Sequence, residues 1–272
     1  MIPAPFTYQR ASSVAQALDL AAAGGEDAKF LAGGHSLMPL MKLRLAVPET
    51  LIDIGRIGEL SYVREEDGHF AIGALTTHSD VAASPVLATG LPLLAHAASQ
   101  IGDPQVRHCG TIGGSIAHAD PAADLPAVLL ALDATVVAQG PSGRREIPAA
   151  GFFTGLFETV LEPAELLTEI RIPRPAAAGW SFQKFTKRGI DWAIVGVAVQ
   201  GGNVALVNMG GTPLRASGVE ADLAAGASPA LAAARAAEGT SPSDDLNGPR
   251  AYREHLARVL TGRALAEAAA RS

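Results

Sequence analysis

The sequence predicts an α+β protein with two domains. Its 272 residues exceed the roughly 150 of an average domain. Of these residues, 48% are hydrophobic and 18% are charged, which is enough apolar material for a sizeable core. Helix-spaced segments and strand-like apolar runs both occur, and the composition shifts near Pro173. Three strand-like runs and an alanine-rich tail follow that shift.

The first 55 residues are expected to form a small α/β unit. Apolar side chains at helical spacing predict a helix over 12–23, capped by Ser12 or Ser13 and stopped by the glycine pair at 24–25. Two short strands are predicted on either side of a glycine turn, over 29–32 and over 50–54.

Residues 56–175 are expected to form a second, larger subdomain with both strands and helices. Two apolar runs flanking Glu66-Asp67-Gly68 predict a hairpin between residues 60 and 75. A helix is predicted over 91–101, and a long turn-rich stretch over 102–124 is expected to precede an apolar helix that runs through Leu132. Further strands are predicted over 134–138 and 166–172, the second closed by Pro173.

The domain boundary is predicted at about residue 175, inside a proline-rich linker over 173–179. An N-terminal domain would then span 1–175, made of subdomains 1–55 and 56–175, and a C-terminal domain would span 176–272. The runs that predict a three-stranded antiparallel sheet are 180–185, 192–200 and 204–209. Residues 221–272 contain 17 alanines and predict helices, with breaks at 241–243 and 248–249.

Charge and cysteine content exclude several classes of protein. The formal net charge is −6, which disfavours a nucleic-acid partner. Cys109 is the only cysteine, so the chain forms no internal disulfide, four-cysteine cluster or cysteine-rich zinc site. No signal-like apolar region is present at the amino terminus, and no apolar run reaches the roughly 18 residues of a membrane span. We therefore expect a cytoplasmic protein without an integral membrane segment.

Two glycine pairs stand out, each followed by a hydroxyl residue after an apolar approach. They lie in the segments Ala32 to Ser36 and Thr111 to Ser115. Without a Cβ the backbone can approach a ligand closely, and its N–H groups can point at an anion such as a phosphate. For a lone pair an ordinary tight turn is the favoured interpretation. Neither segment matches a nicotinamide-binding fingerprint or a phosphate-binding P-loop.

Together, these segments resemble a known family. Residues 32–45, AGGHSLMPLMKLRL, and 101–124, IGDPQVRHCGTIGGSIAHADPAAD, are similar to the FAD-binding medium subunits of the molybdenum hydroxylases. The carbon monoxide dehydrogenase group is nearest, and the xanthine dehydrogenase flavin domains are more distant. The resemblance runs over nearly the whole chain. It implies the two-subdomain FAD-binding fold of the vanillyl-alcohol-oxidase/PCMH type, followed by a C-terminal flavoprotein domain.

The resemblance implies which residues hold the cofactor. The first glycine loop would wrap the FAD pyrophosphate, and the second would hold another part of the cofactor. Asp124 matches a carboxylate that accepts hydrogen bonds from the sugar-alcohol region. The residues of the two loops are Ala32, Gly33, Gly34, His35, Ser36 and the apolar Leu37, and then Thr111, Gly114 and Ser115.

Other positions implied by the resemblance lie near the flavin ring. Ile101 stands where some relatives carry a stacking aromatic, so it can pack on the ring without stacking. A lysine near the pyrimidine edge would stabilise negative charge on the reduced ring. The alternatives Lys184 and Lys187 stay open for that role. Three candidates remain: His118, Leu167 and Trp192. His118 stands where relatives carry a smaller polar residue. Trp192 is either a shield over the flavin ring or a core tryptophan of the sheet.

The implied function is electron transfer. FAD would receive electrons from an iron–sulfur centre and release them to an external acceptor. Because this chain lacks the cysteines for such a centre, the [2Fe–2S] clusters and the molybdenum cofactor are expected on partner subunits only. The expected partners are a small iron–sulfur subunit and a large molybdenum subunit in a dimer of heterotrimers, at most peripheral to the inner face of the membrane. The substrate and the acceptor stay open.

Two other functions stay open as alternatives: a free-standing FAD-dependent oxidoreductase, and a non-catalytic nucleotide-binding module. No convincing acid and base pair supports the first. Nor do His108, Cys109, His118 and Asp120 have the spacing of a metal site. Neighbours in sequence are rarely oriented for proton transfer, which argues against a Cys109–His108 nucleophilic pair. We expect Cys109 to be a small buried residue.

Overall fold

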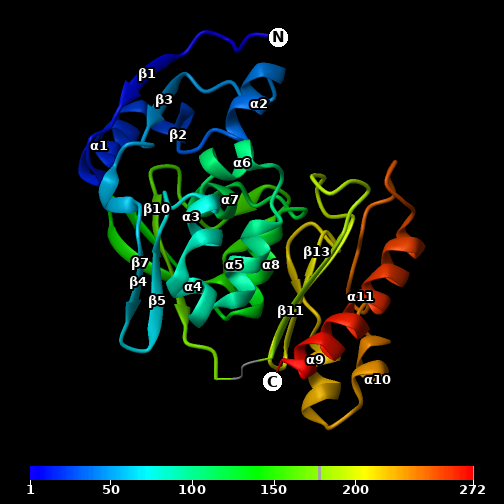
Figure 1. The fold of residues 1–272 in the computed structure, drawn as a ribbon. Helices are drawn as coiled ribbons and strands as arrows, with labels where there is room; N and C mark the ends of the chain where they lie inside the picture. The colour runs from blue at the N-terminus through cyan, green and yellow to red at the C-terminus, as the bar shows by residue number, and fades with distance from the viewer. Residues whose placement is uncertain (177–178, 272) are drawn as a thin grey trace.

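The first subdomain is a small parallel sheet with two helices (Figure 1). The structure is a computed structural model that describes residues 1–176 and 179–271. The strand order is β1-β3-β2, and both outer strands run parallel to β3. The elements are β1 (Thr7–Arg10), α1 (Val14–Gly24), a 3-10 turn (Gly25–Asp27), β2 (Ala28–Leu31), α2 (Leu37–Leu43) and β3 (Thr50–Asp53).

The predicted helix and both predicted strands of this subdomain are confirmed. Ser13 is the N-cap of α1, and its hydroxyl accepts a hydrogen bond from the Gln16 N–H. Sequence reasoning missed β1 and α2. β1 is largely exposed and polar, so only its pairing with β3 identifies it as a strand. α2 has seven residues and carries Pro39 in its first turn, where a missing N–H removes no helical hydrogen bond.

The second subdomain contains a five-stranded antiparallel sheet in the order β4-β5-β10-β6-β7. Its strands are β4 (Val63–Glu66), β5 (His69–Gly73), β6 (Thr135–Gly140), β7 (Gly143–Pro148) and β10 (Leu166–Pro173), and a separate hairpin is formed by β8 (Phe153–Gly155) and β9 (Glu158–Thr159). The predicted hairpin is confirmed, and Gly68 in its turn adopts a φ of +83°.

Helices cover one face of this sheet and separate it from the C-terminal sheet (Figure 1). They are α3 (His78–Ala83), α4 (Pro85–Gly90), α5 (Pro92–Ser99), α6 (Pro104–Cys109), α7 (Ile112–His118) and α8 (Asp124–Ala131), with 3-10 turns at Gly58–Leu60 and Ala149–Gly151. The predicted helices at α5 and α8 are confirmed. All eight residues of α8 are buried, because it packs against β12 and β13 on its other side.

The expected turn-rich stretch over 102–124 is wrong, since it contains α6 and α7. Each helix is short and begins at a side-chain cap. Asp103 accepts a hydrogen bond from the Val106 N–H, and Thr111 accepts one from the Gly114 N–H. The second glycine pair therefore lies inside a helix rather than in a turn. A Cβ on Gly113 would lie 2.6 Å from the Ala74 Cβ, so this glycine lets α7 pack closely on its neighbour.

The C-terminal part is a four-stranded antiparallel sheet backed by helices. Its strands are β11 (Trp180–Phe185), β12 (Val195–Gln200), β13 (Asn203–Val207) and β14 (Leu214–Arg215), and its helices are α9 (Ser217–Ala224), α10 (Pro229–Ala233) and α11 (Arg250–Ala270). The three predicted strands are confirmed, and β14 adds an edge strand that is only two residues long. α11 packs on β11 and β12 (Figure 1). The predicted breaks at 241–243 and 248–249 precede α11.

The largest hydrophobic core crosses from the second subdomain into the C-terminal sheet. It joins Phe70 and Leu129 to Phe182, Ala198 and Val207. Separate clusters lie under the first subdomain and between the C-terminal sheet and α11. The boundary near residue 175 stays a prediction, and positions 177–178 of the predicted linker lie outside the described residues. Because they share this core, the second subdomain and the C-terminal sheet are joined by a packed interface and not only by a linker.

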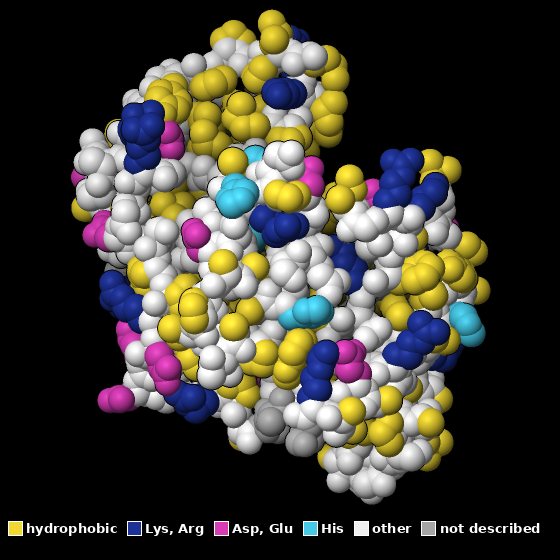
Figure 2. Space-filling view, in the orientation of Figure 1, with side chains coloured by type: hydrophobic (Ala, Val, Ile, Leu, Met, Phe, Trp, Pro, Cys, Tyr) yellow, Lys and Arg dark blue, Asp and Glu magenta, His cyan; other side chains and the backbone are white. Residues whose placement is uncertain are grey.

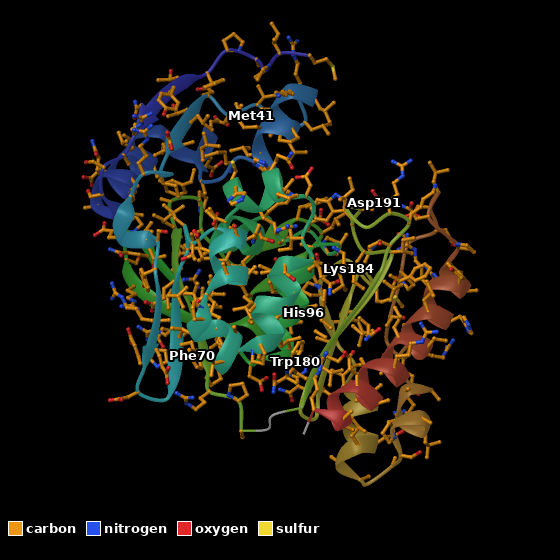
Figure 3. All side chains as sticks on the ribbon, in the orientation of Figure 1. Met41, Phe70, His96, Trp180, Lys184 and Asp191 are labelled. Carbon is orange, nitrogen blue, oxygen red and sulfur yellow. The ribbon has the colours of Figure 1, made fainter. Side chains whose placement is uncertain are left out.

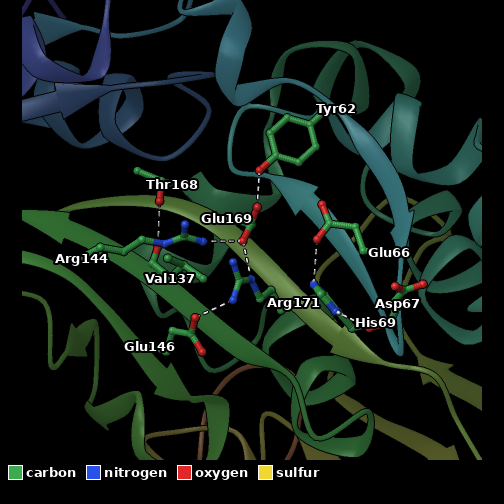
Figure 4. Close-up of polar contacts among 10 residues, drawn as sticks. All are labelled: Tyr62, Glu66, Asp67, His69, Val137, Arg144, Glu146, Thr168, Glu169 and Arg171. Atoms are coloured by element: carbon green, nitrogen blue, oxygen red, sulfur yellow. Dashed lines mark hydrogen bonds and ion pairs between the residues drawn. The ribbon is translucent and has the colours of Figure 1, made fainter.

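A polar network lies on the five-stranded sheet (Figure 4). Glu169 on β10 accepts hydrogen bonds from the Tyr62 hydroxyl and from two arginines, Arg144 and Arg171, at 2.5–2.9 Å. The pKa of Glu169 stays below its ordinary value: burial raises it, but the hydrogen bonds from Tyr62 and Arg171 outweigh the burial. None of these residues lines the cavity described below. The network therefore joins strands and is separate from the candidate site.

Candidate functional site

A cavity of about 730 Å³ lies where the two glycine segments, β10 and the C-terminal domain meet. This volume is within the range of small-molecule and cofactor sites. Fifteen of the sixteen residues predicted from the sequence line it: Ala32, Gly33, Gly34, His35, Ser36, Leu37, Ile101, Thr111, Gly114, Ser115, His118, Asp124, Leu167, Lys184 and Trp192. Lys187 does not. It lines a smaller neighbouring cavity of about 430 Å³.

The first glycine segment connects β2 to α2. Gly34 adopts a φ of +72°, a left-handed conformation that a residue with a Cβ rarely adopts. A Cβ on Gly33 would lie only 2.0 Å from the Cys109 carbonyl oxygen, so the first glycine segment packs against the end of α6, directly before the second segment. His35 is exposed, and its Nδ1 lies 3.0 Å from the Gly33 carbonyl oxygen. The loop thus presents its backbone to the cavity with few side-chain atoms in the way.

The second segment enters the cavity as the start of α7. Backbone hydrogen bonds fix its position: the His78 N–H donates to the Gly110 oxygen at 2.9 Å, and the Ile112 N–H donates to the Thr76 oxygen at 3.0 Å. Thr111 caps the helix through Gly114, and the Ser115 side chain remains in the cavity wall. The small residues at the start of α7 leave room for a ligand beside the first loop.

The buried ion pair Lys184–Asp124 joins the two parts of the chain at the cavity wall. Lys184, labelled in Figure 3, lies on β11. Its Nζ donates to Asp124 Oδ2 at 2.7 Å and to the Gln100 carbonyl oxygen at 3.1 Å. The two side chains are only 4% and 5% exposed. Burial raises the pKa of Asp124 to about 6, although Lys184 acts in the opposite direction. The carboxyl group is therefore mostly ionised at neutral pH.

Asp124 has one oxygen left over. Its Oδ1 is buried and has no hydrogen-bond partner in the part of the chain that the structure describes. A buried polar atom without a partner costs about 1–3 kcal/mol. An ionised carboxylate accepts hydrogen bonds only, so a ligand hydroxyl or N–H would satisfy it. The unpartnered acceptor in the cavity wall therefore fits a cofactor with a hydroxylated chain.

His78 is a cavity residue that sequence reasoning missed. It is buried at the start of α3, and its Nδ1 has no partner among the described residues. Burial lowers its pKa to about 4, with a further contribution from the nearby His35, so the ring is neutral at pH 7. No spacing in the sequence marks this residue, because it reaches the cavity only through the contact of α3 with α6.

Trp192 lies at the rim of the cavity and is 60% exposed, so it is not a core tryptophan of the sheet. It precedes β12 rather than belonging to it. Asn208, which sequence reasoning also missed, holds this segment. The side-chain amide of Asn208 donates to the Ala193 carbonyl oxygen at 2.7 Å, and its backbone N–H donates to the Pro121 carbonyl oxygen at 2.8 Å. Asn208 thus links the segment that carries Trp192 to the segment that leads into Asp124.

Two further expectations concern the segment before α7. Cys109 is exposed, so the prediction of a small buried residue is wrong. It ends α6 on the surface, where the chain turns into the second glycine segment. His118 lines the cavity and pairs with the Phe157 ring at a centroid distance of 5.1 Å. Burial lowers the pKa of His118, and the nearby Asp120 acts in the opposite direction.

Comparisons with known proteins give a consistent result. Residues 4–175 match the family described as "FAD binding domain in molybdopterin dehydrogenase", and residues 180–268 match "CO dehydrogenase flavoprotein C-terminal domain". The chain is 45% identical over 285 residues to the carbon monoxide dehydrogenase medium chain of Hydrogenophaga pseudoflava, covering 100% of this chain and 99% of that protein. It is 41% identical to the 6-hydroxypseudooxynicotine dehydrogenase complex subunit alpha of Paenarthrobacter nicotinovorans, covering 98% of this chain and 96% of that protein.

The fold is also similar to a solved structure. The carbon monoxide dehydrogenase of Hydrogenophaga pseudoflava that lacks the Mo-pyranopterin moiety of its cofactor contains a chain with a TM-score of 0.96 and 46% identity, covering 100% of this chain and 99% of that chain. Among residues 1–176 and 179–271, no helix is both long and apolar enough to cross a membrane. The same residues hold no group of three side chains suited to a metal ion.

Proposed function

The chain belongs to the flavoprotein-subunit family of the molybdopterin dehydrogenases, and from that membership we propose that it is the FAD-carrying electron-transfer subunit of a carbon monoxide dehydrogenase-like molybdenum hydroxylase. The observation that carries the proposal is the unpartnered Asp124 Oδ1 in the wall of a cavity that both glycine segments line. The ribityl chain of FAD supplies the hydroxyl donors that this oxygen lacks.

We assign the first glycine loop to the pyrophosphate of FAD. The support is the close contact of Gly33 with Cys109 at the end of α6 and the left-handed backbone at Gly34, which leave the loop backbone facing the cavity. Backbone N–H groups in such loops bind phosphate oxygens well. On the opposite wall, Thr111, Gly114 and Ser115 would contact the middle of the cofactor.

The flavin end of the site is assigned to the side where the C-terminal domain closes the cavity. Ile101 and Leu167 offer apolar contacts, and Trp192 can cover the ring from the rim. When bound, FAD supplies a ring that accepts and releases electrons singly or in pairs. Lys184 would place a fixed positive charge near the ring and hold the Asp124 carboxylate in position. Of the two lysines left open by the sequence, the cavity favours Lys184.

We further propose the partners of this chain. The curated relatives are named as medium chains or as subunits of dehydrogenase complexes. Since Cys109 is the only cysteine here, [2Fe–2S] clusters would lie on a small iron–sulfur subunit and the molybdenum cofactor on a large subunit. We propose a dimer of such heterotrimers in the cytoplasm, at most peripheral to the inner face of the membrane.

The substrate is proposed from the relatives rather than from this site. Carbon monoxide dehydrogenase medium chains match at 45% and 42% identity, which favours carbon monoxide. Measuring carbon monoxide-dependent dye reduction by the purified complex tests this choice. Turnover of a heteroaromatic compound or an aldehyde in place of carbon monoxide would overturn the substrate and leave the FAD assignment intact.

Reconstitution tests the cofactor. The purified chain, incubated with FAD and desalted, should show flavin absorbance at about one FAD per chain. The Asp124→Leu variant, which removes the unpartnered oxygen together with the partner of Lys184, should retain much less FAD. A chain that takes up ATP or another nucleotide but no FAD would instead be a nucleotide-binding module, and an isolated chain with its own substrate turnover would be a free-standing oxidoreductase.

A further inference from the structure

His78 is a buried polar side chain in the wall of the cavity. It is the first residue of α3 and is only 5% exposed. Its ring lines the cavity, and its Nδ1 has no hydrogen-bond partner among the residues that the structure describes. A buried polar atom without a partner costs stability, and an apolar side chain would fill the same space without that cost. The position therefore points to a ligand that supplies the partner.

The backbone around His78 is fixed beside the second glycine segment. Thr77 and Thr111 form an antiparallel bridge. The His78 N–H donates to the Gly110 carbonyl oxygen at 2.9 Å. A Cβ on Gly110 would lie 2.9 Å from the His78 Cδ2, so the ring takes the space that a side chain at position 110 would need. The ring is therefore held against the residue that precedes the second glycine segment.

The first glycine loop comes to the same place. A Cβ on Gly33 would lie 2.0 Å from the Cys109 carbonyl oxygen, one residue before Gly110. Burial lowers the pKa of His78 most, and His35 of the first loop is near enough to lower it further. Figure 2 shows histidine side chains beside α6, at the edge of the hollow between the lobe that carries α2 and the rest of the molecule. A ligand that spans both glycine segments would therefore pass the His78 ring.

The hydrogen-bonding capacity of the ring indicates which part of a ligand it would contact. Because the ring is neutral at pH 7, it carries one N–H donor and one acceptor nitrogen. The Asp124 carboxylate is an acceptor only and suits ligand hydroxyls, whereas a phosphate oxygen needs a donor such as the imidazole N–H. Hydrogen bonds to a charged phosphate are stronger than those between neutral groups. His78 therefore suits the anionic part of a cofactor.

We propose that His78 donates a ring N–H to a phosphate oxygen of the FAD pyrophosphate, and so helps the two glycine segments to select a dinucleotide over riboflavin. The inference rests on the proposed function, because it takes the cavity to hold FAD. It adds a side-chain donor from α3 to the backbone N–H groups of the first loop. A ligand without the pyrophosphate would gain nothing from this residue.

The test compares two side chains of nearly equal size at position 78. His78→Gln keeps an N–H donor, and His78→Met has the same length without one. His78→Phe is a second apolar variant, which keeps a ring in the space. The matched control His69→Phe removes a histidine of β5 that does not line the cavity. Circular dichroism of each full-length chain, stripped of FAD, checks the fold.

Three probes separate the parts of the cofactor. FAD is the whole ligand, ADP carries a diphosphate without a flavin, and riboflavin carries the flavin and its ribityl chain without a phosphate. We expect the folded apolar variants to bind FAD and ADP about tenfold more weakly, since a hydrogen bond to a charged group is lost, and to bind riboflavin unchanged. His78→Gln should recover most of the loss, and His69→Phe should match the unsubstituted chain for all three probes.

Several results would overturn the role of His78. Undiminished binding of FAD and ADP by a folded apolar variant is one. An equal loss of riboflavin binding is another, because it would mean that His78 only supports the fold, and so is a His78→Gln chain as weak as His78→Met. An unsubstituted chain that binds ADP but not FAD refutes the proposed function, while the ADP affinities still decide whether His78 contacts a phosphate. A chain that binds neither refutes both.

Discussion

The Lys184 ammonium lies 2.7 Å from the Asp124 carboxylate, and this buried pair joins the C-terminal sheet to the first residue of α8. Because both residues line the cavity, this one contact both joins the two parts of the chain and shapes the candidate site. Buried pairs are costly to desolvate, so such a pair is better explained by positioning than by stability. In this arrangement Asp124 Oδ1 has no hydrogen-bond partner among the described residues.

Removal of the lysine should destabilise the chain in a pH-dependent way. In Lys184→Met, Asp124 is left buried without its cation, and we expect unfolding to cost about 3 kcal/mol less at pH 8. Because the pKa of Asp124 is raised in the folded state, its carboxyl group is protonated and uncharged at pH 5. The loss of stability caused by Lys184→Met should therefore be smaller at pH 5 than at pH 8. Urea unfolding at the two pH values measures this. The control Lys187→Met, at an exposed site, should be as stable as the unsubstituted chain at both pH values. An equal loss of stability at pH 5 and pH 8 in Lys184→Met would contradict the explanation.

FAD affinity should fall in acid. Hydroxyl donors to Asp124 favour its ionised form, so binding lowers a pKa that is about 6 in the free chain. Affinity should therefore be constant above pH 6 and decrease by up to about tenfold for each unit below it. Fluorescence titration at pH 5 and pH 7.5 measures the difference. Asp124→Asn should abolish this dependence, and its persistence in that variant would assign it to another group.

The close approach of Gly33 to the Cys109 carbonyl should be indispensable for FAD binding. A side chain at Gly33 would meet the Cys109 carbonyl oxygen and push the loops apart. We expect Gly33→Val to reduce retained FAD at least about tenfold, by analogy with the cost of overpacking a close contact. Gly58→Ala is the control, because nothing lies within 4 Å of a Cβ built there. Circular dichroism checks that both variants are folded. Full FAD occupancy in folded Gly33→Val would disprove the role of the contact.

Trp192 should report cofactor binding. The chain has two tryptophans, and only Trp192 lines the cavity, whereas Trp180 packs against His96 and Arg271. Flavin bound beside the exposed indole should quench its fluorescence. Trp180→Phe should keep most of the quenching and Trp192→Phe should lose most of it. Equal quenching in both variants would show that FAD does not reach Trp192.

Local signals in the sequence predicted much of the fold. Helix α1 and the hairpin at Gly68 could be predicted because a capping serine and a turn glycine act over a few residues. β1 could not, since its polar residues become a strand only beside β3. α6 and α7 are short and rich in turn residues, so their caps at Asp103 and Thr111 were hidden among them.

In the candidate site too, some residues could be predicted from local sequence and others are placed only by tertiary contacts. The glycine segments and Asp124 could be recognised by resemblance, and the cavity contains them. Lys184 and Lys187 could not be separated, because they lie three residues apart and only the pleat and end of β11 determine which one reaches the cavity. His78 and Asn208 were missed since they reach the site through tertiary contacts that no spacing records.

The most direct test of the central claim is the FAD content of the desalted full-length chain, measured by visible absorbance together with that of Asp124→Leu. The account predicts about one FAD for each unsubstituted chain and a large loss in the variant, whose circular dichroism should be unchanged. An unsubstituted chain that retains no FAD, or a folded Asp124→Leu variant that retains it in full, would contradict the account.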